Sequence, residues 1–320
     1  MSPDNSPPAK RQRVENAPIT RSETWMDDGN VVLQAKNIQF RVHWSLLALH
    51  SSVFSDMRGL PQPTDQPTVE GCPVVELADD SVDVEYILKA LYNPTFLAEE
   101  KLPFSAISAL LRMGRKYDFR DLFSSAVKRL TSEFPSSFEE YERIESPVHG
   151  YTTMQYQAGI EFDIIALAKE NNIMTVLPTV CFQVASRIPT PALCEGIQRP
   201  DGTIARLSPE YLTRCVAARE KLLRQQFQPG HTFGWARKWP FAPCSTANHC
   251  RKLRSSLQDN LIDTVIIGAF GQVSDLEDLK FCRTCREHIA ESMAEGRKKM
   301  WELLPGFFNL PSWNELKNDV

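Results

Sequence analysis

The sequence predicts an α+β domain in the first part of the chain and a mainly α-helical region in the second. Three observations support this fold class. Apolar residues alternate over residues 31–42, which indicates β-strands. From Trp44 onward, apolar residues recur at the three- and four-residue spacing of helices. Beyond residue 158 the helical spacing continues, and no comparable strand pattern interrupts it.

The composition is that of an ordinary globular protein, with 42% hydrophobic and 24% charged residues among 320. A chain of this length can bury a large core and commonly forms two domains. The formal net charge of -4 provides no overall attraction to nucleic acid, and no apolar stretch is long enough to span a membrane. We therefore expect neither direct nucleic-acid binding nor membrane insertion.

Residues 1–25 are rich in proline, serine and charge, which predicts a disordered tail. They lack the apolar stretch of a secretory signal peptide. The basic cluster at Lys10, Arg11 and Arg13 fits either a nuclear import signal or a solvated charged segment. Eight cysteines are too sparse for a disulfide scaffold, so we expect an intracellular protein, nuclear or cytoplasmic.

The predicted α+β domain covers residues 26–134. It begins with two short strands joined by a turn at residues 35–37, followed by two short helices that begin near Trp44 and Val53. Residues 59–73 are rich in proline and predict a loop. A strand at 74–77 completes a three-stranded sheet, and short helices flank it. Three longer helices are predicted within 79–94, 104–119 and 120–134.

This order of elements resembles a BTB/POZ domain, which is an interaction fold. The resemblance rests on "DGNVVLQAKNIQFRVHWSLLALHSSVFSDM", where a hairpin precedes Phe-x-Val-His, an apolar pair, a serine and a phenylalanine at a helix end. Further along, "LYNP" and "MGRKYDFRDL" are similar to the family's helix-end tyrosine and its A-x-K-Y-x-x-x-x-L pattern. The long loop at 59–72 departs from the family pattern.

The resemblance implies a protein–protein interaction module that self-associates or recruits partners. It implies a homodimer contact through the first two helices and the opening strand. The expected contact residues are Trp44, Leu47, Phe54 and Met57. The family includes adaptors of cullin-type ubiquitin ligases as well as transcriptional regulators, and both roles remain open. Because no zinc finger with two cysteines and two histidines at finger spacing occurs, a transcription-related cofactor would need a partner to reach DNA.

We do not expect an enzyme. The sequence has no phosphate-binding glycine loop, nucleophile elbow, dinucleotide fingerprint or His-Glu-x-x-His motif. His43 lies where the strand pattern changes to the helical one, and its nearest candidate partners, His50 and Asp56, match no catalytic arrangement. We expect His43 to be a structural residue at the strand-to-helix corner.

In the second half, residues 135–158 are predicted to be a linker and 159–320 a helical domain. Helices are predicted within 159–172, 174–188, 208–227, 247–263 and 274–308, with Ser208 as a cap followed by Pro209. The aromatic segment "WELLPGFFNLPSW" predicts either a flap folded back over the helices or a docking peptide. The ending "GRKKMWELLPGFFNLPSWNEL" resembles BTB proteins of mushroom-forming fungi, where cysteine pairs precede a similar Trp-x-x-Leu-Pro segment.

Four cysteines of this half form two short-spaced pairs. Five residues separate Cys244 from Cys250, and two separate Cys282 from Cys285, which places the latter thiols on one helix face. Two such pairs could close a tetrahedral structural zinc site, in which four protein ligands leave no open position for water.

Other interpretations of these cysteines remain open. His249 or His288 could replace one thiol, or all four cysteines could be ordinary buried thiols. A zinc-dependent enzyme is the opposing hypothesis. It would need three protein ligands, an open position and a general base such as Glu287 or Glu291.

Overall fold

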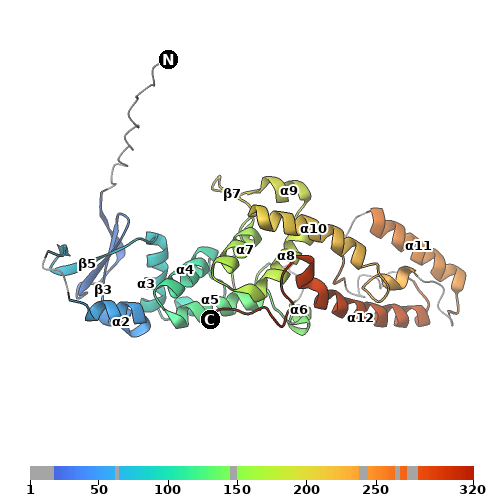
Figure 1. The fold of residues 1–320 in the computed structure, drawn as a ribbon, viewed down its shortest axis with the longest axis horizontal. Coiled ribbons are helices and arrows are strands. Elements are labelled where there is room, and N and C mark those ends of the chain that lie inside the picture. The colour runs from blue at the N-terminus through green and yellow to red at the C-terminus, as the bar shows by residue number, and fades with distance from the viewer. Residues whose placement is uncertain (1–17, 62–64, 145–149, 238–243, 264–266, 272–279) are drawn as a thin grey trace, which may run out of the picture. The chain divides into compact units, whose positions relative to one another are not determined.

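The computed structural model describes residues 18–61, 65–144, 150–237, 244–263, 267–271 and 280–320 (Figure 1). The chain divides into two compact units. The first contains residues up to Ala98 together with Arg112–Leu122, and the second contains Glu99–Leu111 and Phe123–Val320. Most of the predicted tail, including its basic cluster, lies outside the described residues. No helix within the described ranges combines the length and apolar character needed to cross a membrane.

A five-stranded sheet forms the centre of the first unit, in the order β1-β3-β2-β5-β4. The strands are β1 (Thr20–Trp25), β2 (Val31–Ala35), β3 (Ile38–Val42), β4 (Thr68–Val69) and β5 (Cys72–Leu77). β2 and β3 form the predicted antiparallel hairpin, and β5 runs parallel to β2. The apolar residues of β2, and Phe40 and Val42 of β3, are almost fully buried. The predicted α+β class is therefore confirmed.

The two edge strands were not predicted. β1 pairs in parallel with β3, so the structure corrects the predicted tail, which included residues 20–25. β4 pairs with β5 inside the stretch that we predicted as a loop. The three predicted strands thus become five. Hydrophobic periodicity does not detect either edge strand, because β1 is polar and partly exposed along its length and β4 has only two residues.

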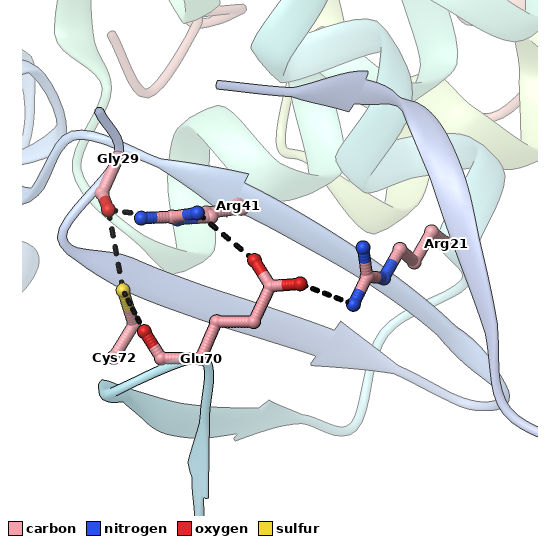
Figure 2. Close-up of polar contacts among 5 residues, drawn as sticks. All are labelled: Arg21, Gly29, Arg41, Glu70 and Cys72. Atoms are coloured by element: carbon pink, nitrogen blue, oxygen red, sulfur yellow. Dashed lines mark hydrogen bonds and ion pairs between the residues drawn. The ribbon is translucent and has the colours of Figure 1, made fainter. Parts of the chain in front are cut away.

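A polar network links β1 and β3 to the turn between β4 and β5 (Figure 2). Glu70, with a φ of 50°, accepts a hydrogen bond from Arg21 at 2.5 Å and one from Arg41 at 3.0 Å. Arg41 also donates to the carbonyl oxygen of Gly29 at 2.9 Å. Because exposed ion pairs contribute at most about 1 kcal/mol, this network positions β1 more than it stabilises the unit.

Three helices accompany the sheet in the first unit: α1 (Trp44–His50), α2 (Ser52–Gly59) and α3 (Ser81–Tyr92), followed by the 3-10 turn η1 (Phe96–Ala98). The backbone N–H of His43 donates to the hydroxyl of Tyr92 at 2.9 Å, and its Nδ1 lies 3.0 Å from the same oxygen. Its Nε2 lies 3.1 Å from Oδ1 of Asp28. His43 thus fastens the corner between β3 and α1 to the end of α3, which confirms its predicted structural role.

Helices α4 (Phe104–Lys116) and α5 (Arg120–Glu133) each contribute residues to both units. The helices of the second unit are α6 (Phe138–Arg143), α7 (Ile160–Glu170), α8 (Leu177–Arg187), α9 (Thr190–Glu195), α10 (Pro209–Gln225), α11 (Ala247–Asp263) and α12 (Arg283–Phe307). The Ser208 side chain accepts the N–H of Tyr211 at the start of α10, as predicted. The short strands β6 (Ile197–Gln198) and β7 (Ile204–Ala205) were not predicted.

The aromatic C-terminal segment folds back on α12, as the flap interpretation predicts. Trp313 stacks on the buried Trp301, with ring centroids 4.9 Å apart, and its Nε1 donates to the Trp301 carbonyl oxygen at 2.7 Å. Farther on, the side-chain oxygen of Asn318 accepts the backbone N–H of Thr175 at 3.1 Å. Trp301 and Trp313 therefore pack against each other within the chain.

The predicted linker is not a free connection. It contains α6, and its residues Thr152 and Thr153 are held by the buried side chain of Glu133 in α5. Oε1 of Glu133 accepts the N–H and the hydroxyl of Thr152 and the hydroxyl of Thr153, each at 2.8 Å, as well as the N–H of Thr153. One carboxylate oxygen therefore satisfies four donors from the segment.

We expect Glu133→Ala to destabilise the second unit by about 2 kcal/mol, because it leaves the partly buried backbone donors of Thr152 and Thr153 without an acceptor. Glu133→Gln keeps the accepting oxygen and should lose much less. Urea unfolding followed by circular dichroism measures both, with the exposed Glu139→Ala as control. Equal stability of Glu133→Ala and the control would contradict the anchoring role.

Candidate interaction surface and metal centre

Three of the four predicted contact residues are buried inside the chain. Trp44, Leu47 and Phe54 are 8%, 1% and 2% exposed. The Trp44 indole N–H donates to the Phe54 carbonyl oxygen at 3.1 Å, and the Phe54 ring stacks on Tyr117 with centroids 5.1 Å apart. The prediction that these three side chains contact a partner is therefore wrong, because they form part of the core of the first unit. Met57 is half-buried and remains at the surface.

Other apolar side chains of α1 and α2 reach solvent instead. Leu49 is 75% exposed, and Leu60, directly after α2, is 62% exposed. We define the α1–α2 surface by the partly or fully exposed apolar residues Leu46, Leu49, Val53, Met57 and Leu60. Of these residues only Met57 was predicted from the sequence, and the leucines of α1 were missed because α1 is apolar on more than one side. The available signal was the run of leucines at 46, 47 and 49, which cannot all face one core.

The structure brings the two predicted cysteine pairs to one point. The Sγ atoms of Cys244, Cys250, Cys282 and Cys285 all lie within 4.8 Å of one another. We call these residues the cysteine cluster. The Sγ atoms of Cys244 and Cys282 are 3.8 Å apart. Cys250 and Cys285 are completely buried, whereas Cys244 and Cys282 are half-buried. Zinc binding by the cluster stays a prediction.

Hydrogen bonds to sulfur connect the two pairs. The backbone N–H of Cys282 donates to Sγ of Cys250 at 3.4 Å, and the hydroxyl of Thr246 lies 3.2 Å from the same sulfur. Cys282 is the N-cap of α12, and the N–H of Cys285 lowers the pKa of the Cys282 thiol to about 5. A thiol at a helix N-terminus is readily present as the thiolate, the form that binds metals. Burial raises the pKa of Cys285.

The histidine ligands considered above do not join the cluster. Nε2 of His249 lies 3.1 Å from the carbonyl oxygen of Lys280, and Nε2 of His288 lies 3.4 Å from the hydroxyl of Ser292. Glu287 pairs with Arg283 on the exposed side of α12 at 2.8 Å. Among the described residues, the ligand set is thus four thiols. Such a set supports a structural metal more than a catalytic one, because a four-thiolate zinc ion keeps no position for a substrate.

The cysteine cluster belongs to a small hydrophobic core of its own. The buried members of this core are Phe233, Trp235, Ala236, Cys250, Leu257, Phe281, Cys285, Ile289 and Met293. Cys244 and Cys282 pack against it from the surface. Figure 1 shows α11 and the start of α12 at the same end of the second unit. Among the residues that the structure describes, nine buried side chains form this core, and two of them are thiols.

Comparison with known proteins identifies the first part of the chain. Residues 22–133 match the family model of the BTB/POZ domain, which is a protein–protein interaction module. The match begins inside β1 and extends to the end of α5, and it leaves the cysteine cluster outside. No curated protein matches the chain.

Proposed function

We propose that this chain, whose residues 22–133 form a BTB/POZ domain, is a non-catalytic adaptor that forms a homodimer through its α1–α2 surface. The observation that carries the proposal is the exposure of Leu49 and Leu60 beside three half-buried apolar residues on two adjacent helices. One exposed leucine is ordinary in a protein surface. Several together on neighbouring helices are typical of a surface covered by another polypeptide.

A second copy of the chain is the occupant that suits this surface. In a twofold interface the same surface serves both subunits, so it must be complementary to itself. The exposed residues of α2 include one acid, Asp56, and one base, Arg58. Each subunit can therefore offer both charges at the rim of an apolar contact, where opposite charges set the register.

The expected result for Leu49→Asp combined with Leu60→Asp is loss of the dimer without loss of the fold. A charged side chain at each position would have to be desolvated in the contact, whereas it stays in water in the monomer. Light scattering at micromolar concentration should give twice the monomer mass for the native chain and the monomer mass for the double variant. Circular dichroism should be unchanged.

Val82→Asp is the matched control, because Val82 is 49% exposed on α3 of the same unit and lies outside the α1–α2 surface. It should remain a dimer. A monomeric native chain, or a double variant that keeps the dimer mass, would refute the proposed contact.

The dimer would present the second unit as a platform for a recruited protein. The BTB/POZ domain supports a cullin-type ubiquitin ligase as that partner, and a transcription-related complex is the second candidate because of the basic cluster at Lys10, Arg11 and Arg13. Affinity purification with mass spectrometry separates the two. Ligase subunits that co-purify with the native chain would support the first role, and transcription factors would support the second.

A further inference from the structure

We infer that the cysteine cluster binds one structural zinc ion, and that this ion is required for the small core around α11 and the start of α12 to fold. The inference concerns the second unit and does not depend on the homodimer proposed for the first.

The distances fit one shared metal. With Zn–S bonds of about 2.3 Å, the sulfur atoms at the corners of a tetrahedron lie about 3.8 Å apart. The Sγ–Sγ distance of Cys244 and Cys282 is 3.8 Å, and all four sulfur atoms lie within 4.8 Å of one another. A modest contraction of the longer distances would therefore complete the tetrahedron.

The chemistry of the ligands favours zinc. Four thiolates without a carboxylate or carbonyl ligand select soft or borderline metals over magnesium or calcium. Each thiol gives up its proton on binding, so a zinc ion with four thiolates carries a net charge of −2. Basic residues stand within two positions of the ligands in the sequence and can offset this charge: Arg251, Lys252 and Arg286. The N–H of Cys282 already donates to a ligand sulfur, Sγ of Cys250.

Ordinary burial does not account for the cluster. Cys244 and Cys282 are half-buried, so their thiols gain little from leaving water, and yet both lie within 4.8 Å of the two buried thiols. The pairs come from segments more than thirty residues apart, before and within α11 on one side and at the start of α12 on the other. One ion would join these segments at a single point.

The size of the surrounding core explains why the ion would be needed. In the described part of the chain this core has nine buried residues, and two of these are the ligands Cys250 and Cys285. Small cores rarely supply enough hydrophobic stabilisation alone and commonly depend on a metal or on disulfides. Binding energy at such a site becomes folding energy, because the unfolded segment does not present the four ligands together.

The first test measures the metal in the full-length chain. Protein purified under reducing conditions should contain one zinc per chain by elemental analysis. After removal of zinc, cobalt(II) added alone should give the intense visible bands of tetrahedral thiolate coordination. Cys285→Ser should abolish both results. Cys194→Ser should retain them, because Cys194 is an exposed cysteine on α9 outside the cluster.

The second test measures the folding role. Removal of zinc should raise hydrogen exchange in α11 and in the first turns of α12 by at least tenfold, while exchange in β2 and β3 stays unchanged. Cys282→His preserves a zinc ligand and should bind cobalt with a weaker sulfur-to-metal absorption, whereas Cys282→Ser should lose tight binding. The comparison of Cys282→His with Cys282→Ser keeps the test valid even if Cys285→Ser fails to fold.

Three outcomes would overturn the inference: a folded chain that contains no metal and binds no cobalt, iron in place of zinc, or two disulfides among the four cysteines in the reduced preparation. Unchanged exchange after zinc removal would refute the folding role. Light scattering of the same samples reports the dimer independently, so failure of this inference is distinguishable from failure of the proposed homodimer.

Discussion

Phe54→Asp is expected to unfold the first unit, not merely to separate subunits. The side chain is 2% exposed and packs on Tyr117 and Phe119, with ring centroids 5.1 and 5.8 Å away. Truncation of a buried phenylalanine costs about 3–5 kcal/mol, and burial of an unpaired carboxylate adds to this. Because domains are stable by only about 5–15 kcal/mol, the native state should be largely lost.

Hydrogen exchange in β2 and β3 measures this effect within the unit, since a two-unit chain need not unfold in one step. Phe54→Asp should remove the protection of these strands. Leu49→Asp carries the same charge on the neighbouring helix at a position 75% exposed and should leave the protection intact. If both variants kept native protection and only the dimer mass changed, Phe54 would be a contact residue after all.

Gly296→Ala is expected to disrupt the second unit to a similar degree. A Cβ atom at this position in α12 would lie 2.3 Å from the carbonyl carbon of His231 and 2.4 Å from the backbone nitrogen of Thr232. Backbone atoms cannot move aside as the end of a flexible side chain can. The hydroxyl of Thr232, which is fully buried, also donates to the Ala269 carbonyl oxygen at 2.5 Å, so the segment is fixed on its other side.

The destabilisation caused by this overlap should exceed the stabilisation of about 1 kcal/mol that alanine brings to a helix interior relative to glycine. We expect a net loss of about 3 kcal/mol, typical of overpacking at a rigid site. Gly306→Ala is the control, because it lies on the same helix with no atom within 4 Å of the added Cβ. Thermal unfolding should show a lower midpoint only for Gly296→Ala, and equal midpoints would contradict the close approach.

The sequence predicted those elements whose signals are local. α11 begins and ends at the predicted residues 247 and 263, and α10 begins directly after its Ser208 cap. The edge strand β1 could not be found in this way, because its pairing with β3 depends on a partner strand and not on its own pattern. Edge strands are often polar, as β1 is, so their apolar residues alternate weakly.

The candidate sites show the same limit. Helical spacing identified α1. It could not show which of the apolar side chains of this helix face the core. Trp44 and Leu47 were therefore predicted to contact a partner, although they are buried. For the cysteines, spacing indicated two pairs. Only the fold shows that both pairs meet and that His249 and His288 point to other partners.

The parallel pairing of β2 with β5 bears on the order of folding. β2 and β3 are joined by a turn of two residues, whereas Val32 pairs with Val74 across more than forty positions of the chain. The hairpin can therefore form first, and the parallel strand joins after a slower search. Each doubling of a flexible loop adds only about 0.6 kcal/mol to the cost of closure. The proline-rich segment before β5 can thus be lengthened in evolution with only a small loss of folding free energy.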